Sequence, residues 1–154
     1  MVFKPVRSAL LAAAALTLTV TTSGCSLFSQ PRDDSGTLTA AATIHINETK
    51  VGDCIAEFPE SGGGISDVKA VPCATAHNAE VYAKTENSLA SSKSWAEDYC
   101  TGEFASYIGI DWNSSILEAT YVAPPSGSTD KTLVCIVMEP GVTDATTSLR
   151  GSAK

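Results

Sequence analysis

The sequence predicts an α+β fold: a small, largely antiparallel sheet of about five strands with one packed helix and two disulfides. Three observations support this fold class. Five short segments have the apolar and β-branched composition of strands, and one segment near residue 100 has the apolar spacing of a helix. Their order along the chain is three strands, a helix and two strands. Four cysteines are distributed over these segments, an even number that suits two disulfides.

Residues 1–24 have the features of a lipoprotein signal peptide. Lys4 and Arg7 give a positive start, and the apolar run SALLAAAALTLTV follows. This run is too short for a finished transmembrane helix but has the length of a signal-peptide core. It ends in TTSGC, where small residues precede Cys25 as in a lipobox, although Thr22 stands where Leu is commonest. We expect lipidation of Cys25; the alternative is ordinary secretion that leaves Cys25 as a thiol.

The charge of the chain argues against nucleic acid as a partner. The full sequence has 10 Lys+Arg and 17 Asp+Glu, and removal of residues 1–24 takes away Lys4 and Arg7, leaving 8 against 17, or −9. Binding to nucleic acid and peripheral binding to anionic lipid both need a basic surface. We therefore expect attachment to the membrane through acyl chains on Cys25 alone.

The mature chain divides into three parts. Residues 25–43 comprise the lipidated cysteine and a segment of small and polar residues, which we interpret as a flexible tether with a reach of about 25 Å. Residues 44–140 form the domain. Residues 141–154 offer little to bury and are expected to be a flexible tail.

Three strands are expected in the first half of the domain, at 50–58, 67–73 and 77–85. The glycine-rich sequence PESGGGISD separates the first two and is typical of a loop. Pro72 lacks a backbone N–H, so the second strand should end at an edge or a bend.

One helix is expected at 94–109. Ser94 and Glu97 have the spacing of a capping box, and Gly109 is a natural stop. The apolar residues that should face the sheet are Ala96, Cys100, Phe104 and Tyr107.

Two strands follow, at 117–124 and 131–139. In the last strand apolar residues alternate to both faces, with Leu133, Cys135 and Val137 on one and Val134, Ile136 and Met138 on the other. Burial on both faces predicts that this strand is central.

The four remaining cysteines predict two disulfides, because an exported domain of this size meets an oxidising compartment. Four cysteines allow three pairings. We favour Cys54–Cys73, across the glycine-rich loop, and Cys100–Cys135, between the helix and the central strand.

The stretch VPCATAHNAEVY contains Cys73, His77 and Glu80, which are the parts of a nucleophilic or metal site. A zinc site of three cysteines and His77 is the first alternative, but no C-x2-C pair is present. A Cys73 nucleophile is the second, but a disulfide would consume it. His77 and Glu80 are three apart, so in a strand they face opposite sides. We predict no catalytic residues, no metal and no cofactor here, and a structural or contact role for both side chains.

The spacing of these residues resembles the septum formation domain of actinobacterial envelope proteins. The resemblance covers about residues 49–151 and includes the tail SLRG at 148–151. It departs from the pattern before Asp130, where members usually have Trp and Gly. The matching positions are Val51, Gly52, Asp53, Cys54, Val71, Pro72, Cys73, His77, Glu80, Val81, Cys100, Asp130 and Cys135. The resemblance implies a role in cell division or envelope growth, without a defined reaction.

Together these observations predict a non-enzymatic, lipid-anchored accessory module on the extracytoplasmic face of the cell membrane. Its partner would be an envelope protein or a cell-wall component. The candidate binding surface comprises His77, Glu80 and Trp112, with the loops 57–67 and 124–130; for Trp112 the alternative is a core-edge residue, which is the more common role at such a position. The alternative is a small envelope enzyme, or a metal- or small-molecule-binding lipoprotein, that uses the Cys73, His77 and Glu80 region.

Overall fold

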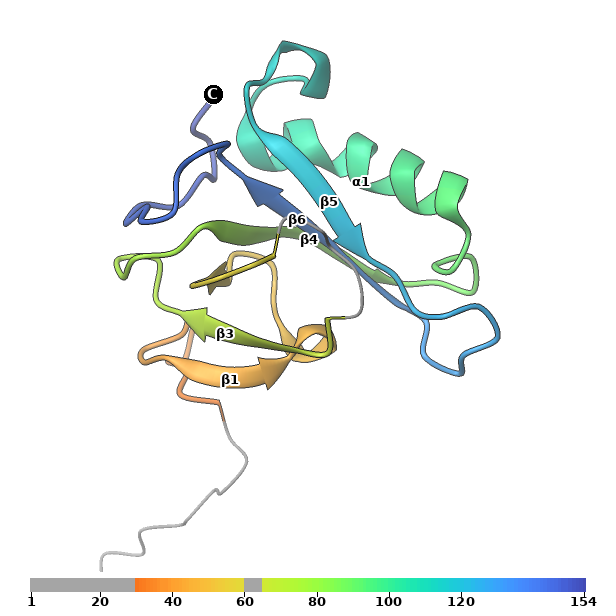
Figure 1. Ribbon diagram of the computed structural model, residues 1–154, viewed down its shortest axis with the longest axis horizontal. Coiled ribbons are helices and arrows are strands. Elements are labelled where there is room, and N and C mark those ends of the chain that lie inside the picture. Colours follow the sequence, from red (N-terminus) through yellow and green to blue (C-terminus); the bar gives the residue numbers. More distant parts are fainter. Residues whose placement is uncertain (1–29, 60–64) are drawn as a thin grey trace, which may run out of the picture.

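The computed structural model describes residues 30–59 and 65–154 (Figure 1). The expected signal peptide, Cys25 and the centre of the glycine-rich loop lie outside the described residues. The elements in chain order are β1 (Ala42–His45), the 3₁₀ turn η1 (Ile46–Glu48), β2 (Cys54–Ile55), β3 (Asp67–Val71), β4 (Ala79–Glu86), α1 (Lys93–Ile108), the 3₁₀ turn η2 (Trp112–Ser114), β5 (Glu118–Val122) and β6 (Thr132–Met138).

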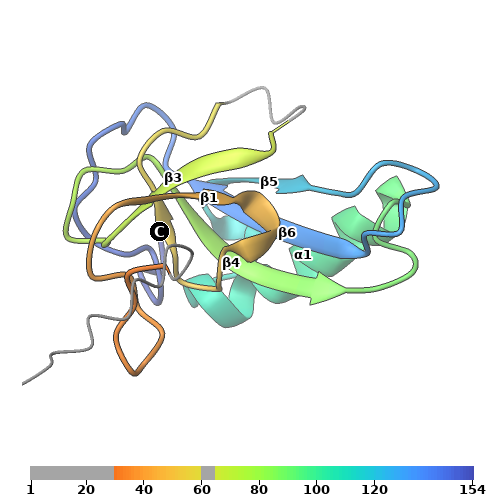
Figure 2. The same ribbon diagram turned by 90° about the horizontal axis from the view of Figure 1, so that it is seen from below.

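The strands form one sheet in the order β1-β3-β2-β4-β6-β5, and every neighbouring pair is antiparallel. The helix α1 packs against the β4, β5 and β6 part of this sheet (Figures 1 and 2). This confirms the α+β fold class. The strand count is six, not about five, because β1 forms across the expected boundary between the tether (25–43) and the domain (44–140), where no strand was predicted.

The strand β6 is the centre of the molecule. It pairs with β4 on one side and β5 on the other, and all of its residues are buried. Leu133, Cys135 and Val137 belong to the core that faces α1, as the alternation predicted. The residues of the opposite face, Val134, Ile136 and Met138, belong to a second core that β1, β2 and β3 complete.

The helix α1 buries the predicted stripe, but it begins differently from the prediction. Ala96, Cys100, Phe104 and Tyr107 are all buried. The residue that precedes the first turn is Ser92, and its side chain makes no capping hydrogen bond, so the Ser94–Glu97 capping box was wrong. At the other end Gly109 has φ +92° and donates its N–H to the carbonyl of Ala105, which confirms it as the stop.

Both favoured disulfides are present. Cys54 and Cys73 have Cα atoms 5.2 Å apart and connect β2 to the end of β3. Cys100 and Cys135 have Cα atoms 5.7 Å apart and fix α1 to β6. Each bond closes a loop of the unfolded chain, which lowers the entropy of unfolding in the chain-entropy account.

The segment expected to be a flexible tether is docked on the domain from residue 31 onward. Arg32 donates to both carboxylate oxygens of Asp53, at 2.7 and 2.6 Å, and Leu38 is buried in the second core. Pro31 accepts the backbone N–H of Thr39 at 2.8 Å. The segment is polar in composition because most of its side chains face water. Arg32 and Leu38 hold it in place through contacts with residues that are distant in the sequence.

The expected flexible tail is also packed. Ala145 forms an isolated β-bridge with His77, and Leu149 is buried against the α1 core. The backbone N–H groups of Gly151 and Ala153 donate to carbonyls at the end of α1, at 2.8 and 2.9 Å. Residues 145–153, which we call the C-terminal segment, are therefore part of the fold.

We predict that Arg32→Ala destabilises the domain by about 3–5 kcal/mol, because it leaves the buried Asp53 carboxylate without its cation. The measurement is urea unfolding followed by far-UV circular dichroism. Lys69→Ala is the control, since Lys69 is an exposed cation on β3 and its loss should change stability by less than about 0.5 kcal/mol. Equal unfolding midpoints for the two variants would show that the ion pair does not hold the N-terminal segment.

Candidate functional site

His77, the first predicted contact residue, is buried, with 2 % of its surface exposed. Its Nδ1 lies 2.8 Å from the carbonyl oxygen of Thr75. A carbonyl only accepts, so Nδ1 carries the proton and donates. The side chain lies against a cavity of about 10 Å³ that Leu149 of the C-terminal segment helps to line. His77 therefore packs the start of β4, which agrees with the structural role expected for it, whereas its place on the candidate binding surface was wrong.

Glu80, the second predicted contact residue, is fully buried. Its carboxyl group accepts hydrogen bonds from the Tyr107 hydroxyl, from Ser148 Oγ at 2.5 Å and from the Leu149 N–H at 2.6 Å. Burial, and then the bond to Glu80, raise the pKa of the Tyr107 hydroxyl above its usual range. The hydroxyl consequently keeps its proton and donates it. Glu80 thus joins β4 to α1 and to the C-terminal segment, and the prediction that it lies on a contact surface was wrong.

The Cys73, His77 and Glu80 region does not assemble as a triad. The donor atoms of Cys54, Cys73 and Glu80 lie within 4.8 Å of one another, and His77 is not in this group. The two sulfurs are bonded to each other. A thiolate, not a disulfide sulfur, is the nucleophile and the metal ligand, so the oxidised site does not fit either chemistry.

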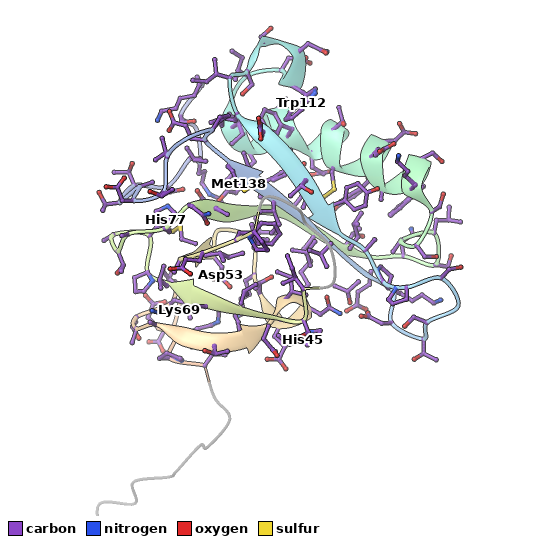
Figure 3. All side chains as sticks on the ribbon, viewed as in Figure 1. His45, Asp53, Lys69, His77, Trp112 and Met138 are labelled. Atoms are coloured by element: carbon purple, nitrogen blue, oxygen red, sulfur yellow. A yellow bond between two sulfur atoms is a disulfide. The ribbon has the colours of Figure 1, made fainter. Side chains whose placement is uncertain are left out.

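The third predicted residue, Trp112, lies at the rim of a groove between α1 and β5 (Figure 3). The groove has a volume of about 430 Å³, within the range of small-ligand sites. We call it the α1–β5 groove; it is lined by Tyr82, Glu97, Cys100, Thr101, Trp112, Ala119, Thr120 and Tyr121.

Trp112 combines the two roles that the sequence left open. Its ring packs edge-on against the buried Phe104, with centroids 5.0 Å apart and an interplanar angle of 87°. The side chain is half-buried, so part of it supports the core and part of it lines the groove. Trp112 follows the helix in the sequence, and the turn η2 brings its side chain back over α1.

Rigid residues form the groove. Tyr82 is buried and donates its hydroxyl to the carbonyl of Cys100 at 2.9 Å. Burial, followed by the nearby charge of Glu103, raises the pKa of Tyr82 above its usual range, so that this bond persists. The Cys100–Cys135 disulfide lies at the same point of α1. The rims on α1 and β5 are therefore fixed relative to each other.

Two groove residues, Tyr121 and Glu97, were not predicted from the sequence. Tyr121 alternates with Ala119 along β5, and both pack toward the α1 core. This alternation is a signal that could have placed Tyr121 opposite the helix. Glu97 was assigned to a capping box, whereas it is exposed on α1 and lines the groove.

The two predicted contact loops are only partly described. Residues 60–64 of the first lie outside the described part of the chain. Pro124, Pro125 and Asp130 of the second line another groove, of about 510 Å³, opposite His45 and Asn47. Asp130 accepts hydrogen bonds from the Thr132 N–H and from the Asn47 side chain, and these bonds, the first above all, lower the pKa of its carboxyl. The polar groups of this second groove are thus used within the fold.

Part of the chain is similar in sequence to two mycobacterial proteins. A protein named "Putative lipoprotein LppN" from Mycobacterium tuberculosis (strain ATCC 25618 / H37Rv) is 32% identical over 95 residues, which is 57% of this chain and 54% of that protein. The protein of the same name from Mycobacterium bovis (strain ATCC BAA-935 / AF2122/97) has the same identity and coverage. The chain spans about half the length of the curated relatives it matches.

No family model matches the chain, and no solved structure matches it. The resemblance to the septum formation domain therefore stays a prediction, while the similarity to proteins named as lipoproteins is a finding. Within residues 30–59 and 65–154, none of the helices has the length and apolar character needed to cross a bilayer.

We predict that Glu80→Gln destabilises the domain by about 1–3 kcal/mol and loosens the C-terminal segment. Glutamine has the same shape as glutamate, but an NH₂ group replaces one of the two carboxylate oxygens. This NH₂ donor would then face another donor, either a hydroxyl or the Leu149 N–H, and one hydrogen bond would be lost. Hydrogen exchange of the Leu149 amide, measured by NMR, should become faster. Glu86→Gln, at the exposed end of the same strand, is the control. Unchanged exchange at Leu149 would contradict the assigned role of Glu80.

Proposed function

We propose that the protein is a lipid-anchored, non-enzymatic binding module on the extracytoplasmic face of the cell membrane, and that the α1–β5 groove contacts an envelope protein or a cell-wall component. The observation that carries this proposal is the groove itself. It presents half-buried Trp112 and Tyr121 on a scaffold fixed by a disulfide. Rigid, partly exposed aromatic side chains supply much of the binding energy in protein contact sites.

The lipid anchor is supported by the sequence before Cys25 and by the similarity to proteins named as lipoproteins. The chain is held from Pro31 onward, by the Pro31–Thr39 hydrogen bond within the segment and by the Arg32–Asp53 ion pair to the domain, and this shortens the tether that we first expected. Six peptide steps separate Cys25 from Pro31, and they span at most about 22 Å when fully extended. The proposed anchor therefore holds the domain close to the membrane.

The groove would then face away from the membrane. In Figure 1 the first described residues lie below β1, whereas α1 and the start of β5 lie at the opposite end of the molecule. A chain anchored below β1 presents the α1–β5 groove on its distal side. This orientation suits contact with components that lie beyond the membrane surface.

The proposal that the module is not an enzyme rests on the side chains that line the groove. Glu97 is its one carboxylate, and neither histidine nor a free thiol lines it. General acid–base and nucleophilic catalysis need at least a pair of such groups in reach of each other. The enzyme alternative would have to use His77 and Glu80, which are buried and engaged with the backbone and the C-terminal segment.

A link to septum formation or envelope growth is the finer part of the proposal. It is supported by the sequence resemblance over residues 49–151, and the identity of the partner would test it.

We predict that Cys25→Ser moves the protein from the membrane fraction to the soluble fraction, because the thioether that carries the diacyl group cannot form. The measurement combines cell fractionation with the intact mass of the unmutated protein, which should show an acylated N-terminus at residue 25. Retention of the Cys25→Ser protein in the membrane fraction would contradict anchoring through this residue.

We further predict that a photo-crosslinking amino acid in place of Tyr121 captures a discrete partner in intact cells. Adding Trp112→Ala to the same chain should reduce the adduct by about tenfold, as expected for an aromatic contact residue. The same amino acid in place of Lys69, which is exposed on β3, is the control. Equal adducts from both positions, or adducts that do not depend on Trp112, would show that the groove is not the contact site.

A further inference from the structure

We infer that the α1–β5 groove binds an organic cation, an alkylammonium group on an apolar stem. This inference rests on the proposed binding role of the groove and specifies the chemistry of its ligand. Three features of the groove support it: the negative charge in its lining, the aromatic side chains on its rims, and the weakness of the ion pair that its carboxylate makes within the chain.

The charges at the groove are negative. Glu97 lines it, and among the eight lining residues there is no lysine, arginine or histidine. Exposed carboxylates also occur next in sequence to lining residues, at Asp98, Asp111 and Glu118, and the exposed cation Lys93 lies one helical turn before Glu97. A groove whose lining holds a carboxylate and no cation disfavours phosphates and carboxylates and favours cations.

The carboxylate of Glu97 is available to a ligand. Its partner within the chain is Lys93, one turn earlier, at 3.8 Å, and both side chains are exposed. Exposed ion pairs of this kind are weak because water and salt screen them. A cation in the groove, where the walls exclude part of the water, would compete successfully with Lys93 for Glu97.

The aromatic side chains suit the same ligand. Trp112 and Tyr121 are both half-buried and line the groove. The face of a Trp or Tyr ring attracts an ammonium group within about 6 Å, and the apolar stem of the ligand gains by contact with the rings and with Ala119. The hydroxyl of Tyr82 is already engaged with the Cys100 carbonyl, which leaves its ring as the part that meets a ligand.

A neutral sugar is the competing class of ligand. Sugar rings also pack on aromatic side chains, and Thr101 and Thr120 offer hydroxyls. The hydroxyls of a neutral sugar can donate to the Glu97 carboxylate, but the ring carries no charge and gains no Coulombic attraction from it. The charge pattern therefore favours the cation, and the sugar becomes an outcome of the test.

The test measures choline and its neutral isostere 3,3-dimethylbutan-1-ol against the full mature chain in a maltoside detergent. The chain has two tryptophans, so Trp95→Phe leaves Trp112 as the fluorescent reporter. We expect saturable binding of choline, with a dissociation constant at least tenfold lower than that of the isostere. N-Acetylglucosamine serves as the neutral sugar probe.

Two variants with the same net charge separate a local contact from a general field. Glu97→Gln should raise the dissociation constant of choline about five- to tenfold, because it removes the one carboxylate in the groove. Asp98→Asn, the neighbouring exposed carboxylate on α1, should change it less than twofold. Circular dichroism of both variants checks that the fold is intact, and exposed substitutions of this type rarely alter it.

Several outcomes would overturn the inference. These are equal binding of choline and its isostere, binding of N-acetylglucosamine without choline, no response of Trp112 to any probe, or choline affinity that is unchanged in Glu97→Gln. If crosslinking through Tyr121 still succeeds in such a case, the proposed binding function stands and only the ligand class fails. If choline binds as expected but Tyr121 captures no partner, the cation site stands and the proposed contact with a large envelope component fails.

Discussion

The burial of β6 on both faces is the constraint on which the rest of this structure depends. A strand with apolar side chains on both sides must be covered twice, and the chain does this with α1 on one face and the β1–β3 part of the sheet on the other. Cys100–Cys135 then fixes the helix to this strand. The position of α1 over β6 and β5 in turn creates the α1–β5 groove. The proposed function thus follows from the same arrangement that forms the core.

Two buried carboxylates hold the ends of the chain onto this core. Asp53 binds Arg32 of the N-terminal segment, and Glu80 binds Ser148 and Leu149 of the C-terminal segment. Both carboxylates belong to the motifs that carry the resemblance to the septum formation domain. Most of those motif residues, like Cys54 and Cys73 beside them, have structural partners. The residues that carry the resemblance are therefore mainly those that stabilise the domain. The groove residues Glu97, Trp112 and Tyr121 are not among them.

The elements that could be predicted from the sequence are those whose partners are encoded by local periodicity. The stripe on α1 and the two faces of β6 are regular alternations, and Gly109 ends the helix through its own backbone freedom. The docked terminal segments could not be predicted in this way. Arg32 binds Asp53, 21 residues away in the sequence, and Ser148 binds Glu80, 68 residues away. Contacts at such separations produce no periodic pattern in the sequence.

The candidate site shows the same limit. His77 and Glu80 are polar, and polar side chains are usually exposed, so they were placed on a contact surface. Both are buried because the C-terminal segment, itself expected to be flexible, covers them. Trp112 was identified because it is a large aromatic residue just after a helix. Its groove partners Glu97 and Tyr121 come from two elements whose relative position only the folded chain defines.

The docked N-terminal segment also limits where a partner can be. A domain of this length has a diameter of about 35 Å, and the chain between Cys25 and Pro31 adds at most about 22 Å. In the proposed arrangement the groove lies on the side distal to β1 (Figure 1), and the sum of these two lengths puts it within about 55–60 Å of the membrane surface. A freely tethered domain would sample a wider zone and many orientations. A closely held domain with its groove facing outward instead favours a ligand fixed in the envelope at a defined height, and a rigid aromatic and acidic groove would not have to be ordered on binding.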